Sequence, residues 1–314
     1  PPPPPPPLFS SRRRHTRYAD RSRGLGDVYK RQTFLDEIIE GRHHFVHPAL
    51  RQELTNKVEA QCATGILNAP DPAFNPGNDK HLVRTYDAPG HTSGKRDNKC
   101  HLQQMLGLIQ DDDAPLFFWP SRLDPIQKGC QLLADIFYHL ISRWWHQNLQ
   151  VVVVADGPYL QVYRDIVDQH GFHQRVAVCD FSEQLEHLGY AAADFILMPS
   201  LFEPCGLPQM IAPTYGALPV AHDTGGIHDT IRHLDVDAET GNGFLFEVYD
   251  SSGLFWAVEE AMRFYNLPAD QRQRHVSRVM TSALVTFNYT VTARHYIDLY
   301  EKMLARPLIV QPPA

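Results

Sequence analysis

The sequence predicts an α/β protein built on a doubly wound parallel sheet. Short apolar runs alternate with helical segments from residue 115 to residue 246, which is the pattern of repeated strand–helix units. Residues 150–155 read QVVVVA, a run without the alternation of a half-exposed strand, as expected for a parallel strand buried on both faces. Polar, glycine-bearing loops follow several runs, and ligands bind at such loops in open α/β sheets. These features favour one Rossmann-like domain over residues 111–305.

The expected strands are short apolar runs bounded by polar or turn-forming residues. They lie at residues 115–120, 150–155, 176–179, 195–198, 218–221 and 243–246. Helices are expected between and after them, the first between Gly129 and Trp145 and the others at residues 159–170, 183–192, 207–215, 252–266 and 291–304. Crossovers between parallel strands are right-handed in nearly all proteins, and we expect the same handedness here.

The segments that flank this domain differ from it. Residues 33–110 contain helical pieces interrupted by Pro48, an irregular loop rich in Asn, Asp, Pro and Gly at residues 68–98, and a helix at residues 98–108. We expect them to be the remainder of a preceding domain and of an interdomain region. Residues 306–314 are expected to form a tail.

Residues 1–32 differ from the rest of the chain in composition. Seven prolines lead into an arginine-rich stretch, and the segment holds eight Lys or Arg but two Asp or Glu. It has no hydrophobic periodicity and cannot bury enough surface to fold, so we expect disorder. Its strings SSRRRHTRY and DVYKRQ resemble translated sequencing adapter, which favours an artefactual head over a functional basic arm. Gly24 and Gly26 are not interpreted as a phosphate loop, because no strand precedes them.

Composition argues against several classes of partner. The net charge of −7 is unfavourable for binding nucleic acid or an anionic membrane. No apolar run approaches the roughly 18 residues of a membrane span. The five cysteines form no C-x-x-C pair and the 17 histidines match no metal-ligand spacing, so we expect neither a metal nor a cofactor. Reduced thiols and a cytoplasmic location fit this pattern. The sequence does not determine the oligomeric state.

Arg122 and Lys128 are the first candidate ligand-binding residues. They flank a proline-containing loop after the first strand, and a guanidinium fork and an ammonium group at this spacing can bind one diphosphate. The alternative is surface charge that caps the next helix. Asp156 and Gly157 end the valine-rich strand, where glycine allows a ligand to approach the backbone. Any parallel strand can end in this way, so the alternative is an ordinary strand end.

Tyr190 and Glu203 are candidates for contacts with a base and a sugar. Tyr190 lies near a helix end, where its ring can stack on a nucleobase or belong to the core. Glu203 follows a buried strand and precedes the turn Cys205-Gly206-Leu207, so we expect its carboxylate to bind sugar hydroxyls rather than lie on a solvated face. The backbone N–H groups of the turn should face the sugar or a phosphate. Cys205 is expected to be a small buried thiol, since no histidine partner for a nucleophile is identifiable nearby.

Thr224, Gly225 and Gly226 begin a further loop. Their N–H and hydroxyl groups are donors of the kind that bind phosphate. The carboxyl ends of parallel strands share one edge of a sheet, so we expect all of these loops to meet there.

Several motifs of this chain occur together in a known enzyme family. They are SRLDPIQKG at residues 121–129, YAAAD at 190–194, PSLFEPCGL at 199–207, TGGI at 224–227 and GNGF at 241–244. In this combination the chain resembles the carboxy-terminal nucleotide-binding domain of the glycogen/starch synthase family of retaining glycosyltransferases. GILN at residues 65–68 and FNP at residues 74–76 fall where that family has its interdomain region.

The resemblance implies a two-domain GT-B fold, of which this chain would be the C-terminal half, with ADP-glucose bound in the cleft. It implies that the enzyme extends an α-1,4-glucan at its non-reducing end, with retention and without a metal. It also implies roles for the candidate residues: Arg122 and Lys128 would neutralise the diphosphate, Glu203 would contact the glucosyl unit, Tyr190 would pack on adenine, and Cys205-Gly206-Leu207 with Thr224-Gly225-Gly226 would line the sugar and phosphate pocket.

The chain also departs from the family pattern. The Lys-x-Gly-Gly-Leu loop and the sugar-facing histidine of the family's amino-terminal domain are missing, so we expect this chain to bind ADP weakly and to transfer no glucose. Pro208, Ile211 and Tyr289 stand where the family usually has Thr, Tyr and Trp. Two alternatives remain open: a GT-B transferase with another nucleotide-sugar donor, and a nucleotide-sugar-binding module without turnover.

Overall fold

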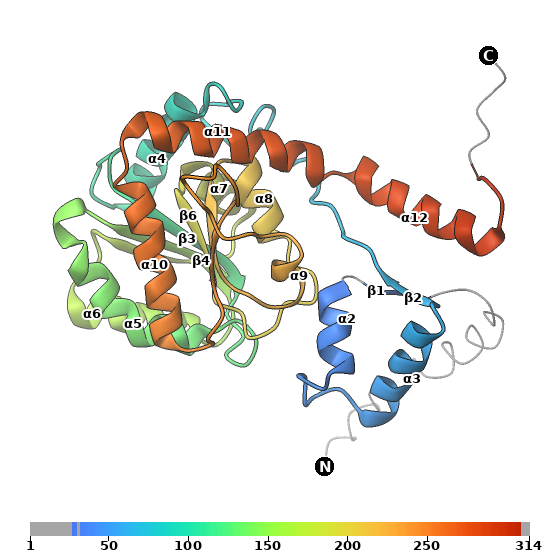
Figure 1. Ribbon diagram of the computed structural model, residues 1–314. Coiled ribbons are helices and arrows are strands. Elements are labelled where there is room, and N and C mark those ends of the chain that lie inside the picture. The colour runs from blue at the N-terminus through green and yellow to red at the C-terminus, as the bar shows by residue number, and fades with distance from the viewer. Residues whose placement is uncertain (1–26, 30–31, 309–314) are drawn as a thin grey trace, which may run out of the picture.

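A six-stranded parallel sheet forms the centre of the molecule (Figure 1). The computed structural model describes residues 27–29 and 32–308 of the chain. Neighbouring strands pair in parallel throughout the order β5-β4-β3-β6-β7-β8. The six predicted strands are confirmed as β3 (Leu116–Arg122), β4 (Gln150–Asp156), β5 (Val176–Asp180), β6 (Phe195–Met198), β7 (Leu218–His222) and β8 (Phe244–Phe246).

The strand order reverses between β3 and β6. The chain first adds β4 and β5 on one side of β3, and it then returns to add β6, β7 and β8 on the other side. In open α/β sheets, ligands bind beyond the carboxyl ends of the strands at such a switch point. The loops that follow β3 and β6 are therefore the place to look for a site.

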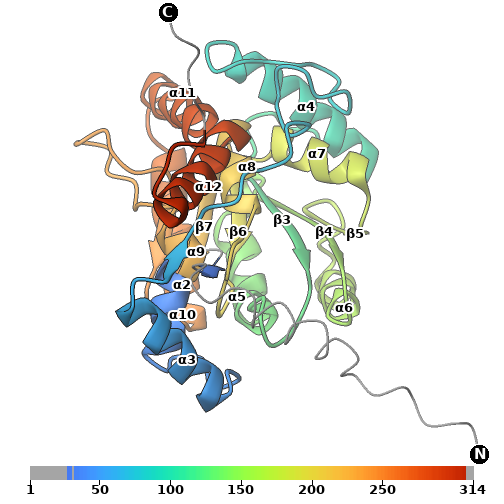
Figure 2. The ribbon, with the colours of Figure 1, turned by 90° about the vertical axis from the view of Figure 1, so that its right-hand side faces the viewer.

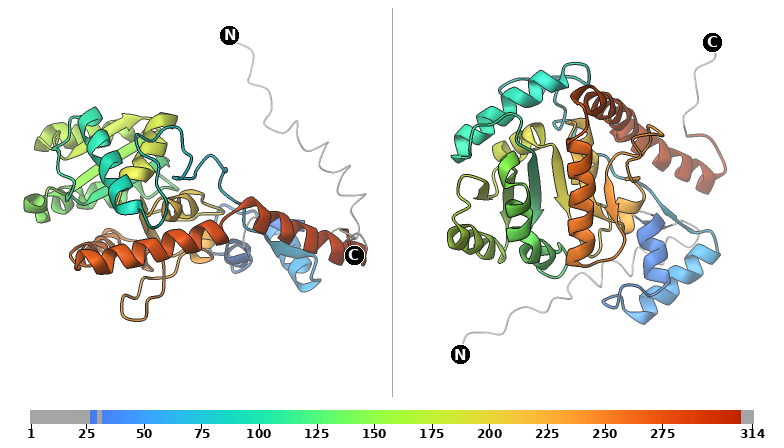
Figure 3. Two further views of the ribbon diagram at one scale, coloured as in Figure 1. Left: turned by 90° about the horizontal axis from the view of Figure 1, so that it is seen from above. Right: turned by 60° about the vertical axis from the view of Figure 1, so that its left-hand side comes forward.

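Helices cover both faces of the sheet (Figure 3). Phe117 and Trp119 of β3 pack into one core cluster, and Leu116 and Phe118 pack into the other, because successive side chains of a strand point to opposite faces. The first face is covered by α5 (Cys130–Arg143), α6 (Leu160–His170) and α10 (Ser251–Tyr265), and the second by α4 (His91–Leu106), α7 (Glu183–Ala192) and α8 (Pro208–Thr214). The predicted doubly wound fold is confirmed.

The helix α11 (Ala269–Thr286) was not predicted. Its first seven residues read ADQRQRH and give no apolar period, whereas Val279 and Met280 in its second half are buried against the two core clusters. Three further elements are short or terminal: the 3-10 turn η1 (Trp145–Gln147), α9 (Gly225–His228) and α12 (Tyr289–Leu304).

Helix α4 and the loop before it belong to the sheet domain. Tyr86, Leu102 and Leu108 are part of the second core cluster, and the Tyr86 hydroxyl donates a hydrogen bond to the carbonyl of Tyr215, 2.8 Å away. The predicted domain boundary at residue 110 and the predicted irregular loop through residue 98 are therefore wrong. The buried residues of α4 include His91, Lys95, Asn98, Lys99 and Gln103, and these polar side chains concealed its helical period.

A small unit precedes this domain. It consists of β1 (Asp27–Tyr29), α2 (Gln32–Ile39), α3 (Pro48–Glu59) and β2 (Ala63–Gly65), and Leu35, Ile38 and Leu54 form its core. Pro48 begins α3, a position where its missing N–H costs no hydrogen bond. Strand β1 pairs in parallel with β2, although it lies within the segment 1–32 that we expected to be disordered. The rest of that expectation falls on residues 1–26 and 30–31, outside the described residues.

The small unit contacts the sheet domain through α2 and through residues of the loop that follows it. Helix α2 lies beside α9, as Figure 2 shows. Helix α12 runs away from the sheet toward β2, and the Thr292 hydroxyl donates a hydrogen bond of 2.9 Å to the carbonyl of Leu67 (Figure 1). Within residues 27–29 and 32–308, no helix has the length and apolar character needed to cross a membrane.

Candidate functional site

Lys128 and Glu203 meet at the switch point of the sheet. Lys128 lies in the loop after β3 and Glu203 in the loop after β6, and Nζ of Lys128 donates to Oε2 of Glu203 at 2.6 Å. Both side chains are largely buried, with 15% and 7% of their surfaces exposed. This contact holds the two side chains in one geometry at the sheet edge. The predicted convergence of these two residues is confirmed.

Backbone contacts between the two loops bring this pair together. The N–H of Leu201 donates to the carbonyl of Gln127 at 2.8 Å, and the Gln127 amide donates to the carbonyl of Phe202 at 3.3 Å. Gly129 has φ +65, and a Cβ at this position would overlap the carbonyl oxygen of Pro199. Glycine at residue 129 therefore permits the close approach that aligns Lys128 with Glu203.

Arg122 lies at the carboxyl end of β3, on the same edge as Lys128. It is exposed, and its guanidinium makes no hydrogen bond or ion pair with the part of the chain that the structure describes. In the sheet register Arg122 is paired with Asp156, the last residue of β4. Arg122 is thus a cation at the site edge whose hydrogen-bond donors remain available to an anion.

Gly157 serves a contact within the protein. Its φ is +121, and a Cβ there would lie 2.9 Å from the carbonyl oxygen of Leu123. The N–H of Leu123 donates to the carbonyl of Asp156 at 2.6 Å. The close approach that we attributed to a ligand at this glycine is therefore made by the backbone of Leu123.

The turn Cys205-Gly206-Leu207 is held by Gln209, a residue that the sequence did not single out. The fully buried Gln209 amide donates to the carbonyl of Cys205 at 2.9 Å. Gly206 has φ +60, and a Cβ there would overlap the end of the Gln209 side chain. Leu207 is 39% exposed beside the turn. The Asn68 amide donates to the Sγ of Cys205 at 3.5 Å, which links the interdomain segment to this turn.

The donors of Thr224 and Gly225 are already engaged by the protein. Oε1 of Glu37, on α2, accepts hydrogen bonds from the Gly225 N–H at 2.7 Å and from the Thr224 hydroxyl at 3.0 Å. The Gly226 N–H donates to the carbonyl of Glu203 at 2.8 Å. The prediction that these three residues present donors to a phosphate is wrong, because a carboxylate and a carbonyl of the same chain accept those hydrogen bonds.

Tyr190 is part of the core. Its side chain is fully buried, and its ring packs edge-on against Phe118 at 5.3 Å and Phe74 at 5.8 Å between centroids. The prediction that Tyr190 stacks on a base is therefore wrong. Residues 190–193 of the motif YAAAD are buried where α7 packs on the sheet, and a Cβ on the preceding Gly189 would lie 2.5 Å from the ring of Phe118.

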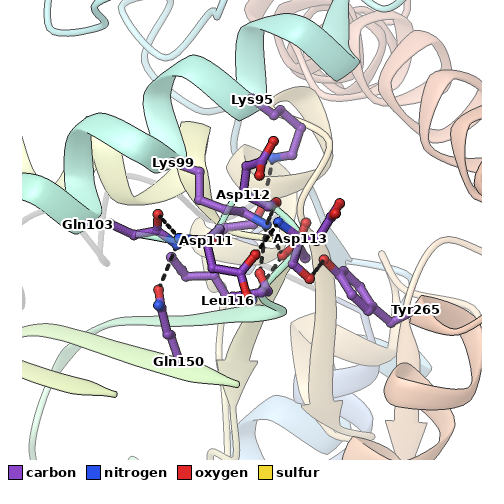
Figure 4. A network of polar contacts seen from close by, with 12 residues as sticks. Lys95, Lys99, Gln103, Asp111, Asp112, Asp113, Leu116, Gln150 and Tyr265 are labelled. Atoms are coloured by element: carbon purple, nitrogen blue, oxygen red, sulfur yellow. Dashed lines mark hydrogen bonds and ion pairs between the residues drawn. The ribbon is translucent and has the colours of Figure 1, made fainter. Parts of the chain in front are cut away.

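A second polar network lies at the opposite edge of the sheet, before the strands begin (Figure 4). Nζ of Lys99 donates to Oδ2 of Asp194 at 2.6 Å and to the carbonyl of Ala114 at 2.9 Å. Nζ of Lys95 donates to three carbonyls, those of Ala191, Ala193 and Tyr215. A pocket of about 230 Å³ borders this network. Carbonyls at the ends of α7 and α8 satisfy Lys95, and the residues just before β3 and β6 satisfy Lys99, so we interpret the network as an anchor for α4.

One group of three described residues has ligand atoms close enough to hold a metal ion: Asp79, His81 and His187. Oδ2 of Asp79 accepts from the Tyr215 hydroxyl at 2.5 Å and from Nδ1 of His187 at 2.7 Å. Its Oδ1 accepts from the N–H of His81 at 2.9 Å. Three protein donors thus satisfy the carboxylate, and the group ties the loop before α4 to α7 and α8.

The comparisons with known proteins agree with this architecture. Residues 114–263 match the family described as "Glycosyl transferases group 1". The chain is 34% identical over 244 residues to the glycogen synthase of Bacillus cytotoxicus, across 77% of this chain and 49% of that protein. It is 36% identical over 247 residues to the glycogen synthase of Bacillus subtilis, across 76% of this chain and 48% of that protein. The catalytic domain of starch synthase IV from Arabidopsis thaliana, solved with ADP and acarbose, superposes with a TM-score of 0.77 at 31% identity, covering 89% of this chain and 56% of that chain.

The switch point between β3 and β6 and these matches define a fold of the GT-B glycosyltransferase type. The relatives that the chain resembles at 31–36% identity are glycogen synthases and a starch synthase. The chain spans about half the length of the curated relatives it matches.

Proposed function

We propose that this chain provides the donor-binding part of an enzyme that transfers glucose from ADP-glucose to the non-reducing end of an α-1,4-glucan, with retention at the anomeric carbon. The observation that carries this proposal is the contact between Lys128 and Glu203 at the switch point. The family supports the choice of substrate, since its relatives include glycogen synthases and a starch synthase solved with ADP.

The distance between Lys128 and Glu203 matches the chemistry of a nucleotide sugar. In such a donor the diphosphate is bonded directly to the anomeric carbon, so the groups that bind phosphate and sugar must be neighbours. Lys128 and Glu203 are 2.6 Å apart. In the proposed complex, Lys128 turns from Glu203 toward the diphosphate, and the Glu203 carboxylate accepts hydrogen bonds from glucosyl hydroxyls. The turn Cys205-Gly206-Leu207 lines the sugar side.

Arg122 and Lys128 supply the charge that the reaction needs. As the bond from the anomeric carbon to the phosphate breaks, negative charge develops on the leaving ADP. Fixed cations at that position stabilise the transition state more than the ground state. Arg122 offers a planar fork and Lys128 a point charge, so the two can bind different oxygens of one diphosphate.

A cytoplasmic location is part of the same proposal. The five cysteines all lie in the described part of the chain, and none of them forms a disulfide. Unpaired, scattered cysteines are typical of proteins in a reducing compartment.

Titration calorimetry of the chain with ADP and with UDP tests the donor assignment. We expect ADP to bind, and to bind more tightly than UDP. Tighter binding of UDP would point to a transferase with another donor. A transfer assay with labelled ADP-glucose and glycogen tests turnover separately. We expect no transfer by this chain alone, since the lysine–glycine loop of the family's amino-terminal domain is not in its sequence.

A further inference from the structure

Glu37, in the small amino-terminal unit, connects two parts of the candidate site. Its side chain is buried, with 7% of its surface exposed, and lies between α2 and α9. Oε1 accepts the two hydrogen bonds from Thr224 and Gly225, and Oε2 accepts one from Nε2 of His43 at 2.9 Å. Both oxygens of this carboxylate are thus used to join α2 and residue 43 to the start of α9.

The start of α9 is held from the other side by Glu203. The Gly226 N–H donates to the carbonyl of Glu203, 2.8 Å away. Gly225 has φ +44, and a Cβ there would overlap the same carbonyl oxygen and lie 3.5 Å from Cβ of Phe34. Gly225 is therefore enclosed between the small unit and the backbone of the sugar-binding candidate, without room for any side chain.

An aromatic cluster makes a second connection to the Glu203 turn. The ring of His43 lies 5.7 Å from that of Phe202, the residue directly before Glu203. The ring of Phe45 lies 4.8 Å from Phe202 and 5.3 Å from His43. His43 therefore touches both the Glu37 carboxylate and the turn that carries Glu203. Two short chains of contacts thus link Glu37 to the turn that carries Glu203.

We propose that Glu37 is a positioning residue for the nucleotide-sugar site, which fixes the backbone of the Glu203 turn by holding the start of α9 and His43. Its loss leaves the buried Gly225 N–H and Thr224 hydroxyl without their acceptor, so the loop must open toward water. The effect on ligand binding rests on the proposed function, whereas the effect on loop opening does not.

The test compares three variants of the complete chain. Glu37→Ala removes the acceptor. Glu37→Gln keeps an oxygen for Thr224 and Gly225 and places an amide donor against His43, whose ring can accept in its other tautomer. Glu40→Gln is the matched control, because Glu40 directly follows the same helix and pairs with Arg42 on the surface, where 53% of its side chain is exposed.

Amide hydrogen exchange in the ligand-free chain is the first measurement. We expect Glu37→Ala to raise exchange at least tenfold in peptides that contain residues 200–207 and 222–229, with no change around α5 and β4. Glu37→Gln should restore most of the protection, and Glu40→Gln should match the wild type. Unchanged exchange in Glu37→Ala, or an equal rise over the whole chain, overturns the proposal, since general destabilisation does not single out these two loops.

ADP and ADP-glucose affinities are the second measurement, made well below the melting temperature. We expect Glu37→Ala to weaken ADP-glucose binding about tenfold and ADP binding less, because the glucosyl contact depends on Glu203. Equal weakening of both ligands, or no rescue by Glu37→Gln, contradicts a positioning role. If the wild type itself binds neither ligand, the proposed function fails and the role in affinity fails with it, while the exchange result still decides whether Glu37 holds the two loops.

Discussion

Lys128 and Glu203 are 75 positions apart in the sequence, yet Nζ and Oε2 lie 2.6 Å apart in the fold. The reversal of strand order between β3 and β6 brings their loops to one edge, and Gly129 allows the loops to touch. In the proposed complex, the group that binds the diphosphate and the group that binds the sugar are thereby neighbours, as a nucleotide sugar requires.

Removing either cation should weaken ADP binding. We expect Lys128→Ala and Arg122→Ala each to lower the ADP affinity by ~1–3 kcal/mol, the usual contribution of a hydrogen bond to a charged group. Calorimetric titration measures this directly. Arg143→Ala is the control, because Arg143 ends α5 and pairs with Glu259. Unchanged ADP affinity in both site variants would remove these residues from the site.

Neutralising Glu203 should separate binding of the nucleotide from binding of the sugar. In Glu203→Gln, Lys128 no longer faces a carboxylate, so its charge is fully available to the diphosphate. We expect ADP to bind as tightly as in the wild type or more tightly, while the extra affinity of ADP-glucose over ADP is lost. A parallel loss of both affinities would mean that Glu203 supports the fold rather than the sugar contact.

Gly129 should tolerate no side chain. Gly129→Ala carries the strain of a left-handed backbone and also forces Cβ into the Pro199 carbonyl. Gly107→Ala is a matched control, with φ +67 against +65 at Gly129 and no heavy atom within 4 Å of the added Cβ. We expect the Gly129 variant to lose ~1–3 kcal/mol more unfolding free energy than the control, as for other overpacked positions. Urea denaturation gives both values, and equal losses would show that the loops can separate without cost.

His91 should make stability depend on pH in the mildly acidic range. Burial lowers the pKa of His91, and the nearby charge of Lys95 acts in the same direction, against a hydrogen bond to the Ala88 carbonyl. At mildly acidic pH the unfolded chain therefore binds a proton at His91 that the folded chain does not bind. The contribution of His91 to the free energy of unfolding is fully present above the unfolded pKa of about 6.5, and it decreases as the pH falls below that value. His91→Asn should show a smaller loss between pH 7.5 and pH 5 than the wild type.

The control for this prediction is His173→Asn, because 64% of the His173 side chain is exposed. Thermal unfolding at several pH values measures the effect. A pH dependence that is the same in the wild type and both variants would show that His91 makes no contribution.

The buried Asp79 should add a further loss of stability at lower pH. Burial raises the pKa of this carboxyl group, but the hydrogen bonds that it accepts from His187 and Tyr215 outweigh burial and lower the pKa.

The six strands could be predicted because each is a continuous apolar run, and the meeting of Lys128 and Glu203 follows from the rule that loops after parallel strands share an edge. The start of α4 could not, because hydrogen bonds satisfy its buried polar side chains. Lys95 and Lys99 donate to a carbonyl and a carboxylate far along the chain, and Asn98 donates to the carbonyl of Arg84. Sequence periodicity records apolar burial and misses polar burial of this kind.

The roles of Thr224 and Gly225 could not be predicted for a related reason. Their donors suit an anion, as the sequence indicates, but the anion is the side chain of Glu37, at a sequence separation of 187 or more. The sequence allowed Tyr190 to be either a core residue or a ligand contact. Its packing against Phe118 and Phe74 shows that it is a core residue. Gln209 gave no signal, because a glutamine inside a helix is ordinarily exposed.

The most direct test is to map where ADP protects backbone amides from hydrogen exchange. The account predicts protection in residues 122–129 and 199–207, the loops after β3 and β6. It predicts none around the pocket at the opposite edge, which is lined in part by Lys95, Lys99 and Arg272. Protection at that pocket, with none in the two loops, would contradict the placement of the nucleotide-sugar site at the switch point.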